Sequence, residues 1–524
     1  MFSAIGHILR LGRAGWTLAR HDALVPREYA HLAPVAAAGL AAVLRLGGKT
    51  RDGGRALRPG ERLAAALSTL GPAYIKLGQF LATRPDMVGF QLAQDLAALQ
   101  DRLPPFAQDV ADQAVAAETG APVSDTFLEF GPAVAAASIA QVHKAALKDG
   151  RAVAVKVLRP GVEAACARDV QAFFFAARLA ERASKEARRL EAVAFVETLA
   201  DSIRTELDLR MEAAAASELA EGLQDDKDVR TPAPVWEVSG RRVFVMDWIE
   251  GTSIGDIDAL DRQGVDRAVL ADTVMRVFLR QAMGSGFFHA DMHQGNLFVD
   301  GQGRLALVDF GIMGRLDEDA QRYLAEILWG FLRRDYARVA RVHFEAGYVP
   351  ARHSVDKFAQ ALRAVGEPIF GQGAADISMS RLMLQLFEVT ALFDMHLRPE
   401  LVLLQKTMVT VEGVARTLDP AHNMWEASAP VVEAWMQKRV GPEAHLKIAR
   451  DSALEAGRLL QHLPETLRAA DRLSRFVGED GVKLDPASLE ALSSKPQPVG
   501  WGKIIAGMLA GGALAAMLMK VLSD

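Results

Sequence analysis

Residues 286–311, GFFHADMHQGNLFVDGQGRLALVDFG, contain an HxD sequence, an Asn five residues after its Asp, and a DFG triplet. The apolar runs LFV and LALV flank a DGQG turn and predict a hairpin that brings Asn296 close to Asp309. A triphosphate carries several negative charges, so fast transfer of its phosphate needs hard oxygen ligands for magnesium. The stretch therefore predicts a phosphoryl-transfer site, with Asp291 accepting a hydroxyl proton, Asn296 and Asp309 binding the metal, and His289 packing the loop.

An upstream lysine fits the same chemistry. Residues 153–157, VAVKV, form a β-branched run that predicts a strand carrying Lys156. In kinase-like nucleotide sites, a strand lysine of this kind contacts the phosphates. The sequence therefore predicts Lys156 as a phosphate-binding residue.

The segment before that strand is rich in alanine. Residues 132–142, PAVAAASIAQV, lie where a glycine-rich phosphate loop would lie, but they contain no glycine. Alanine keeps the side chains small but disfavours positive φ, so we expect a stiff loop over the phosphates. The residues expected to contact the nucleotide are Ala135, Ala136, Ala137, Ser138, Ile139, Ala140 and Val142.

Two further motifs lie on either side of the alanine-rich loop and the VAVKV strand. Residues 76–79, KLGQ, match a KxGQ pattern, and residues 206–208, ELD, match an ExD pattern. Together with the alanine-rich loop, VAVKV, HADxHxGN and DFG, they resemble the UbiB family of atypical protein-kinase-like proteins, in the family's order from residue 71 to residue 314. The resemblance implies an α+β, bilobal, kinase-like fold, binding of ATP and Mg²⁺, membrane association, and a requirement in ubiquinone biosynthesis.

The resemblance also implies roles for individual residues. Glu206 would pair with Lys156 and hold it on the phosphates, and the alternative is an i,i+4 helix pair with Arg210. Lys76 and Gln79 would lie on a helix that covers the nucleotide site, with Lys76 close to the phosphates or to the acidic ExD residues. The alternative for that helix is an ordinary exposed polar face.

The same comparison indicates three departures from ordinary kinases. His293 takes the position where protein kinases carry a lysine beside the γ-phosphate, and it would bind phosphate more weakly and in a pH-dependent way. The separation of 50 residues between Lys156 and Glu206 predicts an extra helix over about 162–185. Glu212 is followed by Ala213, Ala214 and Ala215, so the Asn that family members generally carry after ExD is absent.

The composition is that of a large globular protein. The 524-residue chain has a net charge of −5 with both signs well mixed, which does not suggest a nucleic-acid partner. Its single cysteine, Cys166, excludes an intramolecular disulfide and agrees with a reducing compartment. No secretory signal is expected, because the first apolar stretch lacks a charged start and a cleavage pattern.

The N-terminal segment predicts a basic amphipathic helix. Over residues 2–21, Arg10, Arg13 and Arg20 gather on one side at about 100° per residue. The other side carries Ile5, Ile8, Leu11, Trp16 and Leu18. Such a helix lies on an anionic membrane, docks on a partner, or packs on its own domain, and a mitochondrial transit peptide has the same charge signature. The Gly- and Arg-rich residues 49–60 predict a linker.

The C-terminal segment predicts a membrane span. Residues 504–519, IIAGMLAGGALAAMLM, carry no charge, and flanking apolar residues and lysines extend their reach toward the roughly 20 residues that a span needs. Gly507 and Gly511 form a GxxxG pattern, which favours a homodimer through this tail. A buried core helix is the alternative, but the linker-like residues 493–500, SSKPQPVG, favour a detached tail.

These features predict five regions. They are an N-terminal amphipathic helix and linker (1–60), a KxGQ helical extension (61–120), a kinase-like domain (121–345), a helical C-lobe extension (346–492) and a transmembrane tail (499–522). Residues 315–490 have helical periodicity and few strand signals. We therefore expect a single-pass membrane protein with its catalytic domain in the cytoplasm, in the bacterial inner membrane or, in a eukaryote, in mitochondria.

The motifs and the resemblance favour an ATPase or phosphotransferase required for ubiquinone biosynthesis. Its expected partners are ATP, a membrane lipid or quinone precursor, and ubiquinone-biosynthesis enzymes. The alternatives are a protein or small-molecule kinase and a non-catalytic, ATP-gated membrane scaffold. A complete set of catalytic residues argues against the scaffold, and a stiff phosphate loop under a covering helix argues against a free protein substrate.

Overall fold

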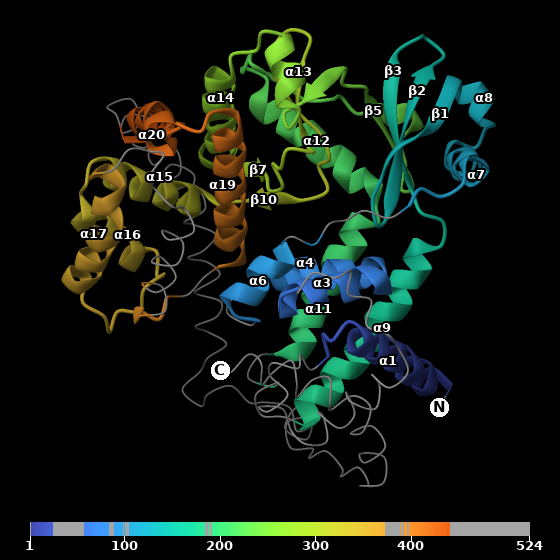
Figure 1. Cartoon of the computed structure of the whole chain (residues 1–524), viewed down its shortest axis with the longest axis horizontal. Coiled ribbons are helices and arrows are strands. Elements are labelled where there is room, and N and C mark those ends of the chain that lie inside the picture. The colour runs from blue at the N-terminus through green and yellow to red at the C-terminus, as the bar shows by residue number, and fades with distance from the viewer. Residues whose placement is uncertain are drawn as a thin grey trace, which may run out of the picture.

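The sequence motifs lie at the junction of two lobes, one built around an antiparallel sheet and one mostly helical (Figure 1). The computed structural model describes residues 2–24, 57–82, 88–97, 99, 104–183, 188, 191–371, 389, 392–395 and 398–440. The mixed helix and strand content expected from the motifs is confirmed for this part of the chain.

The first lobe contains a four-stranded antiparallel sheet. Its strands, in spatial order, are β1 (Phe127–Ala136), β2 (Ala140–Leu147), β3 (Ala152–Leu158) and β5 (Val243–Asp247). Side chains alternate between the two faces of a strand, so Val153, Val155 and Val157 pack together beneath α7 (Gln108–Thr119). The same alternation directs Lys156 to the opposite face, toward the second lobe.

The alanine-rich segment is mostly strand. A loop was expected over residues 132–142, but β1 continues to Ala136 and β2 begins at Ala140, so only residues 137–139 form the turn. The expectation was wrong because alanine tolerates extended backbone, and none of these residues has positive φ. The stiffness expected of this segment therefore arises from strand pairing as well as from the missing glycines.

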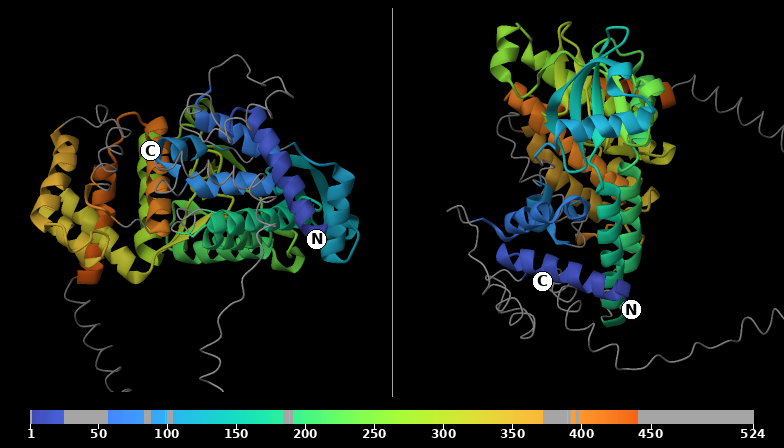
Figure 2. Two further views of the ribbon diagram at one scale, coloured as in Figure 1. Left: turned by 90° about the horizontal axis from the view of Figure 1, so that it is seen from below. Right: turned by 90° about the vertical axis from the view of Figure 1, so that its right-hand side faces the viewer.

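Long helices connect β3 to β5. The extra helix expected over 162–185 is confirmed as α9 (Val162–Ala183), which is followed by α11 (Ala192–Glu206) and α12 (Leu209–Leu223). Four N-terminal helices pack in the region of α9 and α11: α1 (Phe2–Arg20), α3 (Pro59–Leu70), α4 (Pro72–Ala82) and α6 (Phe90–Ala97). Figure 2 shows α1 at the end of α9 that lies away from the sheet.

Two details of the N-terminal region differ from expectation. The linker expected over 49–60 ends early, because Pro59 starts α3 and Glu61 accepts a hydrogen bond from the Arg58 backbone N–H. Trp16, expected on the apolar side of the first helix with Leu11, is 40% exposed, whereas Leu11 is buried. These two residues lie about 140° apart at about 100° per residue, so one helix face does not bury both.

The second lobe begins with short strands and helices. Its strands are β4 (Val229–Arg230), β6 (Gly251–Ser253), β7 (Phe287–His289), β8 (Leu297–Asp300), β9 (Leu305–Leu307) and β10 (Met313–Arg315). The hairpin expected over LFV and LALV is confirmed, because β8 and β9 pair in antiparallel fashion. This hairpin carries Asn296 at its start and is followed by Asp309, so it sets the distance between the two expected metal ligands.

Helices complete the molecule. The short ones are α8 (Val123–Thr126), η2 (Trp236–Val238), α13 (Ile257–Arg262) and the π-helical turn η3 (Gln281–Ser285). The long ones are α14 (Arg267–Arg280), α15 (Glu318–Leu332), α16 (Tyr336–Glu345), α17 (Val355–Gly371), α19 (Pro399–Leu418) and α20 (Met424–Val440). The helical character expected for residues 315–490 is confirmed for the described residues, which end at Val440.

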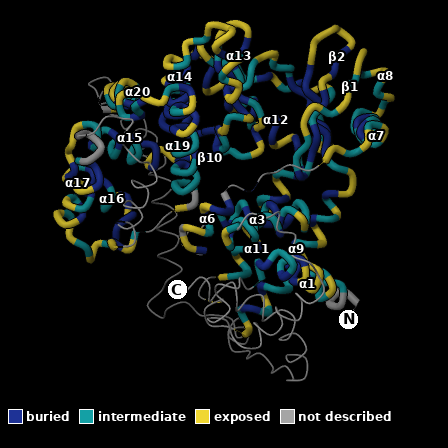
Figure 3. Tube along the Cα trace, viewed as in Figure 1, coloured by how far each residue is buried: buried dark blue, intermediate teal, exposed yellow. Residues whose placement is uncertain are grey.

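Burial follows the two lobes. Buried residues concentrate in the sheet, in α14 and around the hairpin, and exposed residues dominate the periphery (Figure 3). In the ranges given above, no helix combines the length and the apolar character needed to cross a membrane. The expected tail at 499–522, with Gly507 and Gly511, lies outside the described residues.

Candidate active site

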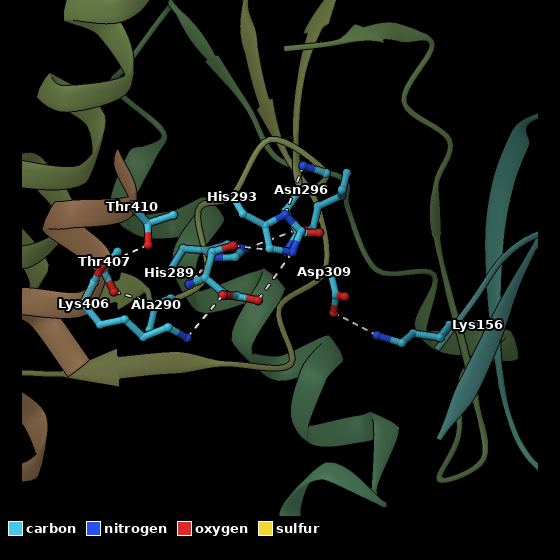
Figure 4. Close-up of polar contacts among 12 residues, drawn as sticks. Lys156, His289, Ala290, His293, Asn296, Asp309, Lys406, Thr407 and Thr410 are labelled. Carbon is cyan, nitrogen blue, oxygen red and sulfur yellow. Dashed lines mark hydrogen bonds and ion pairs between the residues drawn. The ribbon is translucent and has the colours of Figure 1, made fainter. Parts of the chain in front are cut away.

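His289 holds the loop that carries Asp291. Its Nδ1 atom accepts a hydrogen bond from the Asp291 backbone N–H at 3.1 Å, and its Nε2 atom lies 3.1 Å from the Val308 carbonyl oxygen (Figure 4). An accepting Nδ1 leaves the proton on Nε2, which donates to that carbonyl. Burial lowers the pKa of His289 and keeps this neutral form. The ring therefore fixes the backbone of the loop.

Asn296 joins the loop to the hairpin. Its Nδ2 atom donates to the Asp291 carbonyl oxygen at 3.0 Å, and its own carbonyl oxygen accepts from the Val308 N–H at 3.0 Å. This orientation uses the amide nitrogen and leaves the side-chain oxygen, Oδ1, with no hydrogen-bond partner among the described residues. The Asn296 side chain is only 7% exposed, and an amide oxygen that no protein group occupies is suited to a hard cation.

Asp309 has an unusual backbone conformation. Its φ is +63°, in the left-handed region that few residues other than glycine adopt. Its side chain is half exposed, and Oδ1 lies 2.9 Å from Lys156 Nζ. Lys156 holds the pKa of Asp309 well below its ordinary range, so the carboxylate stays ionised. Backbone strain at such a position is typical of functional sites.

Lys156 is buried between two carboxylates, but one of them is not the expected residue. Its Nζ atom lies 2.7 Å from Glu212 Oε1 and 2.9 Å from Asp309 Oδ1. Burial alone would lower the pKa of Lys156, but Asp309 and Glu212 outweigh burial and raise it. The expected pairing of Lys156 with Glu206 is wrong, because α11 ends at Glu206 and the sheet faces the next helix, α12.

Burial also affects the partner of this ion pair. Glu212 is buried, and its desolvation raises its pKa to about 7, although Lys156 acts in the opposite direction. The chain places Glu212 six residues after Glu206, beyond the short break that Asp208 caps by accepting from the Arg210 N–H. The sequence signal for Glu212 was an acidic residue in the first turn of a new helix, but the ExD pattern drew attention to Glu206 instead.

Glu206 binds a different lysine. Lys76 Nζ lies 2.5 Å from Glu206 Oε2, and the Lys76 side chain is only 14% exposed. The expected contact between the KxGQ helix and the ExD motif is therefore confirmed, and the alternative of an exposed lysine face is wrong. The alternative pair of Glu206 with Arg210 is also wrong, since Arg210 Nη2 lies 2.6 Å from Asp208 Oδ2.

The KxGQ helix lies against the alanine-rich turn. Lys76, Gln79, Ser138, Ile139 and Glu206 line a gap of about 10 Å³, which is room for about one water molecule. The glycine of the motif allows close packing of this helix: a Cβ at Gly78 would lie 2.7 Å from Leu67 Cδ1 of α3. The structure thus brings together two segments that the sequence separates by about sixty residues.

The turn itself is held by Arg159, which the sequence did not single out. Arg159 Nε and Nη2 both donate to the Ala137 carbonyl oxygen at 3.0 Å, and Nη2 also donates to Pro104 at 2.7 Å. Ala135, Ala136, Ala140 and Val142 lie in the paired strands beside the turn. The whole segment is therefore fixed by main-chain pairing and by one arginine.

Two residues of α19 reach the loop that carries Asp291 and were not expected there. Lys406 Nζ lies 3.6 Å from Asp291 Oδ1, and Thr407 Oγ1 donates to the Ala290 carbonyl oxygen at 3.0 Å (Figure 4). On the other side, His293 Nε2 lies 3.6 Å from Asp291 Oδ2. The available signal was a Lys-Thr pair inside the apolar run LVLLQKTMVTV, since polar groups in such a run need a buried partner.

The residues present fit a magnesium ion and a nucleotide. Asn296 Oδ1 and the ionised Asp309 are oxygen donors on two ends of one hairpin, and Lys156 adds a buried cation beside them. The part of the chain that the structure describes contains no cluster of three or more His, Cys, Asp or Glu side chains that could hold a metal. A site with two protein oxygens is nevertheless typical of magnesium, which keeps waters and substrate phosphates as its other ligands.

The fold and the site together define an atypical kinase-like protein. The ABC1 atypical kinase-like domain matches residues 98–343, and the UbiB helical domain matches residues 362–423. The chain is 41% identical to a "Probable protein kinase UbiB" of Marinobacter nauticus, over 80% of this chain and 76% of that protein. A protein of the same name from Pseudomonas aeruginosa is 40% identical, over 80% and 79% of the two chains. The chain therefore belongs to the UbiB family.

A solved structure is also similar. It is the complex of Rv3197 with erythromycin from Mycobacterium tuberculosis, with 24% sequence identity and a TM-score of 0.48, covering 71% of this chain and 94% of that chain.

Proposed function

We propose that this chain binds ATP with magnesium and either hydrolyses it or transfers its terminal phosphoryl group, in support of ubiquinone biosynthesis at a membrane. The observation that carries the proposal is the buried Lys156 held between Glu212 and Asp309. Burying a lysine costs much free energy unless the lysine is paired. Its pairing with Asp309 places Lys156 beside the oxygen donors of the hairpin, Asn296 and Asp309. Membership of a family whose members are named as probable protein kinases supports the same reading.

Each residue has a chemical role in this proposal. Lys156 contacts the phosphates when nucleotide replaces its contact with Asp309, and Glu212 keeps it oriented. Asn296 and Asp309 hold magnesium, which when bound would neutralise charge on the phosphates. Asp291 accepts the proton of the attacking water or hydroxyl group. Backbone groups of Ala135, Ala136, Ala137, Ser138, Ile139, Ala140 and Val142 form the cover over the phosphates.

Lys406 supplies a cation that the catalytic loop lacks. Ordinary kinases place a lysine within this loop, and the corresponding residue here is His293. The Lys406 ammonium group lies at 3.6 Å from Asp291 on the side opposite His293, so both flank the carboxylate. We propose that Lys406 stabilises negative charge on the transferred phosphoryl group, which is the electrostatic role that the loop lysine has in ordinary kinases.

Hydrolysis or transfer to a small acceptor is favoured over transfer to a free protein. The buried pair of Lys76 and Glu206 fixes the KxGQ helix against the alanine-rich turn, and the remaining gap there is about 10 Å³. A protein segment would have to displace this helix to enter from that side. The alternative of a non-catalytic scaffold is disfavoured because Asp291 is ordered by His289 and Asn296 as a base requires.

Nucleotide binding is tested by thermal unfolding of the purified full-length chain. Mg-ATP or Mg-ADP at a hundredfold excess over Kd should stabilise it by about 2.7 kcal/mol. Asp309→Asn should abolish the shift, whereas Asp258→Asn, which removes an exposed carboxylate of α13, should retain it. Equal shifts in Asp309→Asn and the parent would refute the proposed site.

Membrane attachment through residues 499–522, with dimerisation through Gly507 and Gly511, is part of the same proposal. Deleting residues 501–524 should move the protein from the membrane fraction to the soluble fraction and leave the nucleotide-dependent thermal shift intact. Retention in the membrane fraction would assign the anchor to another segment. Turnover of ATP with and without vesicles and quinone-precursor analogues then tests whether a lipid, a quinone precursor or another biosynthetic enzyme is the acceptor or activator.

A further inference from the structure

The helix that carries Glu212 is held at its other end by a buried carboxylate. α12 runs between the sheet that carries Lys156 and the helix α14 (Figure 1). Asp226 lies just beyond the end of α12, and its side chain is only 2% exposed. Its Oδ2 atom lies 2.5 Å from Arg276 Nη1 and 2.7 Å from Arg280 Nη1. Asp226 therefore fixes this end of α12 to two arginines of α14.

The chain that follows Asp226 joins the sheet of the second lobe. Asp226 Oδ1 accepts a hydrogen bond from the Asp228 backbone N–H at 3.2 Å, and Asp228 Oδ2 lies 2.8 Å from Arg276 Nη2. The carbonyl oxygen of Asp228 accepts from the Leu305 N–H at 2.8 Å, and β4 then pairs with β9 in parallel fashion. Asp226 thus lies where α12 meets the sheet that contains the hairpin of the candidate site.

Two contacts attach α12 to the second lobe along its length. Glu218 Oε1 lies 2.7 Å from Arg315 Nη2 of β10, the strand that follows the DFG triplet. Near the end of α12, a Cβ at Gly222 would lie 3.3 Å from Ser285 Oγ of η3, so the two backbones approach closely. Both side chains of the Glu218 pair are exposed, and exposed ion pairs contribute little. The buried cluster around Asp226 is therefore the stronger ionic attachment of α12 to this lobe.

The first turn of the same helix orients Lys156. Glu212 Oε1 lies 2.7 Å from Lys156 Nζ, and about three turns of helix separate Glu212 from the end of α12. In protein kinases, the corresponding pair of a strand lysine and a helix glutamate must be formed for activity, and the position of the helix controls it. Here the helix is attached to the lobe that carries Asp291 and Asp309, so the position of Glu212 follows that lobe.

We propose that Asp226 is a positioning residue for the nucleotide site. With Arg276 and Arg280 it fixes the end of α12, and α12 in turn holds Glu212 against Lys156. This inference rests on the proposed binding of Mg-ATP. By charge alone, loss of a carboxylate would favour an anionic nucleotide, so a positioning role predicts an effect of the opposite sign.

The test is a calorimetric titration of the full-length protein with Mg-ATP. Asp226→Asn should weaken binding about fivefold, because it frees the end of α12. Arg280→Gln is a milder variant that leaves Asp226 paired with Arg276, and it should weaken binding about two- to threefold. Glu326→Gln is the matched control: it removes a mostly buried carboxylate of α15 that also binds two arginines, and it should leave Kd unchanged.

A double-mutant cycle separates positioning from a general structural effect. If Asp226 acts through Glu212, adding Asp226→Asn to Glu212→Gln should weaken Mg-ATP binding by less than about twofold more. A merely structural role would produce the same fivefold loss in both backgrounds. If Asp226→Asn does not fold, the same cycle is made with Arg280→Gln.

The possible outcomes distinguish this inference from the proposed function. Absence of Mg-ATP binding by the parent would refute the proposed function and this inference with it. Binding by the parent, with an equal or lower Kd in Asp226→Asn, would refute this inference alone. A loss that persists in the Glu212→Gln background, or an equal loss in Glu326→Gln, would reduce Asp226 to a residue that only stabilises the fold.

Discussion

Glu212 Oε1 lies 2.7 Å from Lys156 Nζ, although the sequence pattern pointed to Glu206 for this contact. Glu206 instead lies 2.5 Å from Lys76 Nζ. The two glutamates are on consecutive helices, so each orients a different lysine. One ion pair belongs to the proposed nucleotide site, and the other belongs to the KxGQ helix that lies against the alanine-rich turn.

The separate roles of Glu212 and Glu206 can be tested by substituting each glutamate in turn. Glu212→Gln should weaken Mg-ATP binding by about tenfold, because Lys156 keeps only Asp309 to orient it and that carboxylate is needed for magnesium. Glu206→Gln should weaken Mg-ATP binding much less. The two dissociation constants are measured by calorimetry, and similar values would show that Glu206 also supports Lys156.

Lys406 should affect the chemical step more than nucleotide binding. We expect Lys406→Gln to lower kcat for ATP turnover about ten- to hundredfold and to leave Kd for Mg-ATP nearly unchanged, because charge on the phosphoryl group develops in the transition state. Lys438→Gln removes an exposed lysine of α20 and serves as the control. A rise in Kd with unchanged kcat would make Lys406 a simple binding residue.

The covering helix should respond to the loss of its ion pair. Lys76→Gln leaves Glu206 mostly buried without its partner, so it should destabilise the protein more than the double variant Lys76→Gln, Glu206→Gln does. The coupling energy from a urea-unfolding double-mutant cycle should be about 0.5–3 kcal/mol. We also expect Lys76→Gln to change turnover or nucleotide preference. Additive stability effects and unchanged turnover would contradict a covering role.

Introducing glycine should make the backbone of the alanine-rich turn more flexible. Ala137→Gly permits positive φ at a position whose N–H donates to the Ala140 carbonyl oxygen at 2.8 Å. Because Arg159 still holds the turn, we expect the fold to persist while nucleotide preference or turnover changes. Steady-state kinetics with several nucleotides measure this, and parent-like values for all of them would exclude a role of turn stiffness.

His289 should make the catalytic loop sensitive to acid. Its pKa is lowered in the folded state, so the neutral ring contributes stability above the ordinary histidine pKa of about 6.5, and this stability is lost as pH falls below it. Protonation of Nδ1 would also break its hydrogen bond with the Asp291 N–H. The fall in melting temperature from neutral to mildly acidic pH should be smaller in His289→Asn, whose side chain does not titrate.

Part of the acid dependence should remain in that variant. Burial lowers the pKa of His343 to about 4, and this residue lies in α16, away from the loop. Its contribution is lost as pH falls from about 6.5 toward 4. An acid dependence in His289→Asn equal to that of the parent would show that His289 does not titrate with unfolding.

Patterns within one short stretch predicted geometry well. The hairpin between Asn296 and Asp309 follows from apolar runs and a turn, because local pairing needs no information from distant segments. The long helix before Ala192 was predictable from spacing alone. The extent of the strands around Ala136 was not predictable from the sequence. Alanine occurs in loops and in strands, and the pairing of β1 with β2 decides between them.

Contacts between distant segments were predicted less well. The ExD pattern identified an acidic position but not the helix break between Glu206 and Leu209, which rotates Glu212 toward Lys156. The residues around Lys406 in the sequence do not resemble a catalytic motif, because its contact with Asp291 depends on where α19 packs in three dimensions. Arg159 was overlooked for the same reason, since its partners are main-chain carbonyls of other segments.

The hydrogen bond from Thr407 to Ala290 joins two regions that sequence comparison treats as separate domains. The kinase-like domain recognised by sequence comparison ends at residue 343, yet the loop that carries Asp291 is braced by α19, and α20 reaches η3 through Trp435, whose Nε1 donates to the Met283 carbonyl oxygen at 2.6 Å. An excised fragment ending at residue 343 would lose Lys406 and both braces. We therefore expect the smallest active fragment to include both the kinase-like domain and the helical region that contains α19 and α20. In chimaeras with relatives, these two regions would have to be exchanged together.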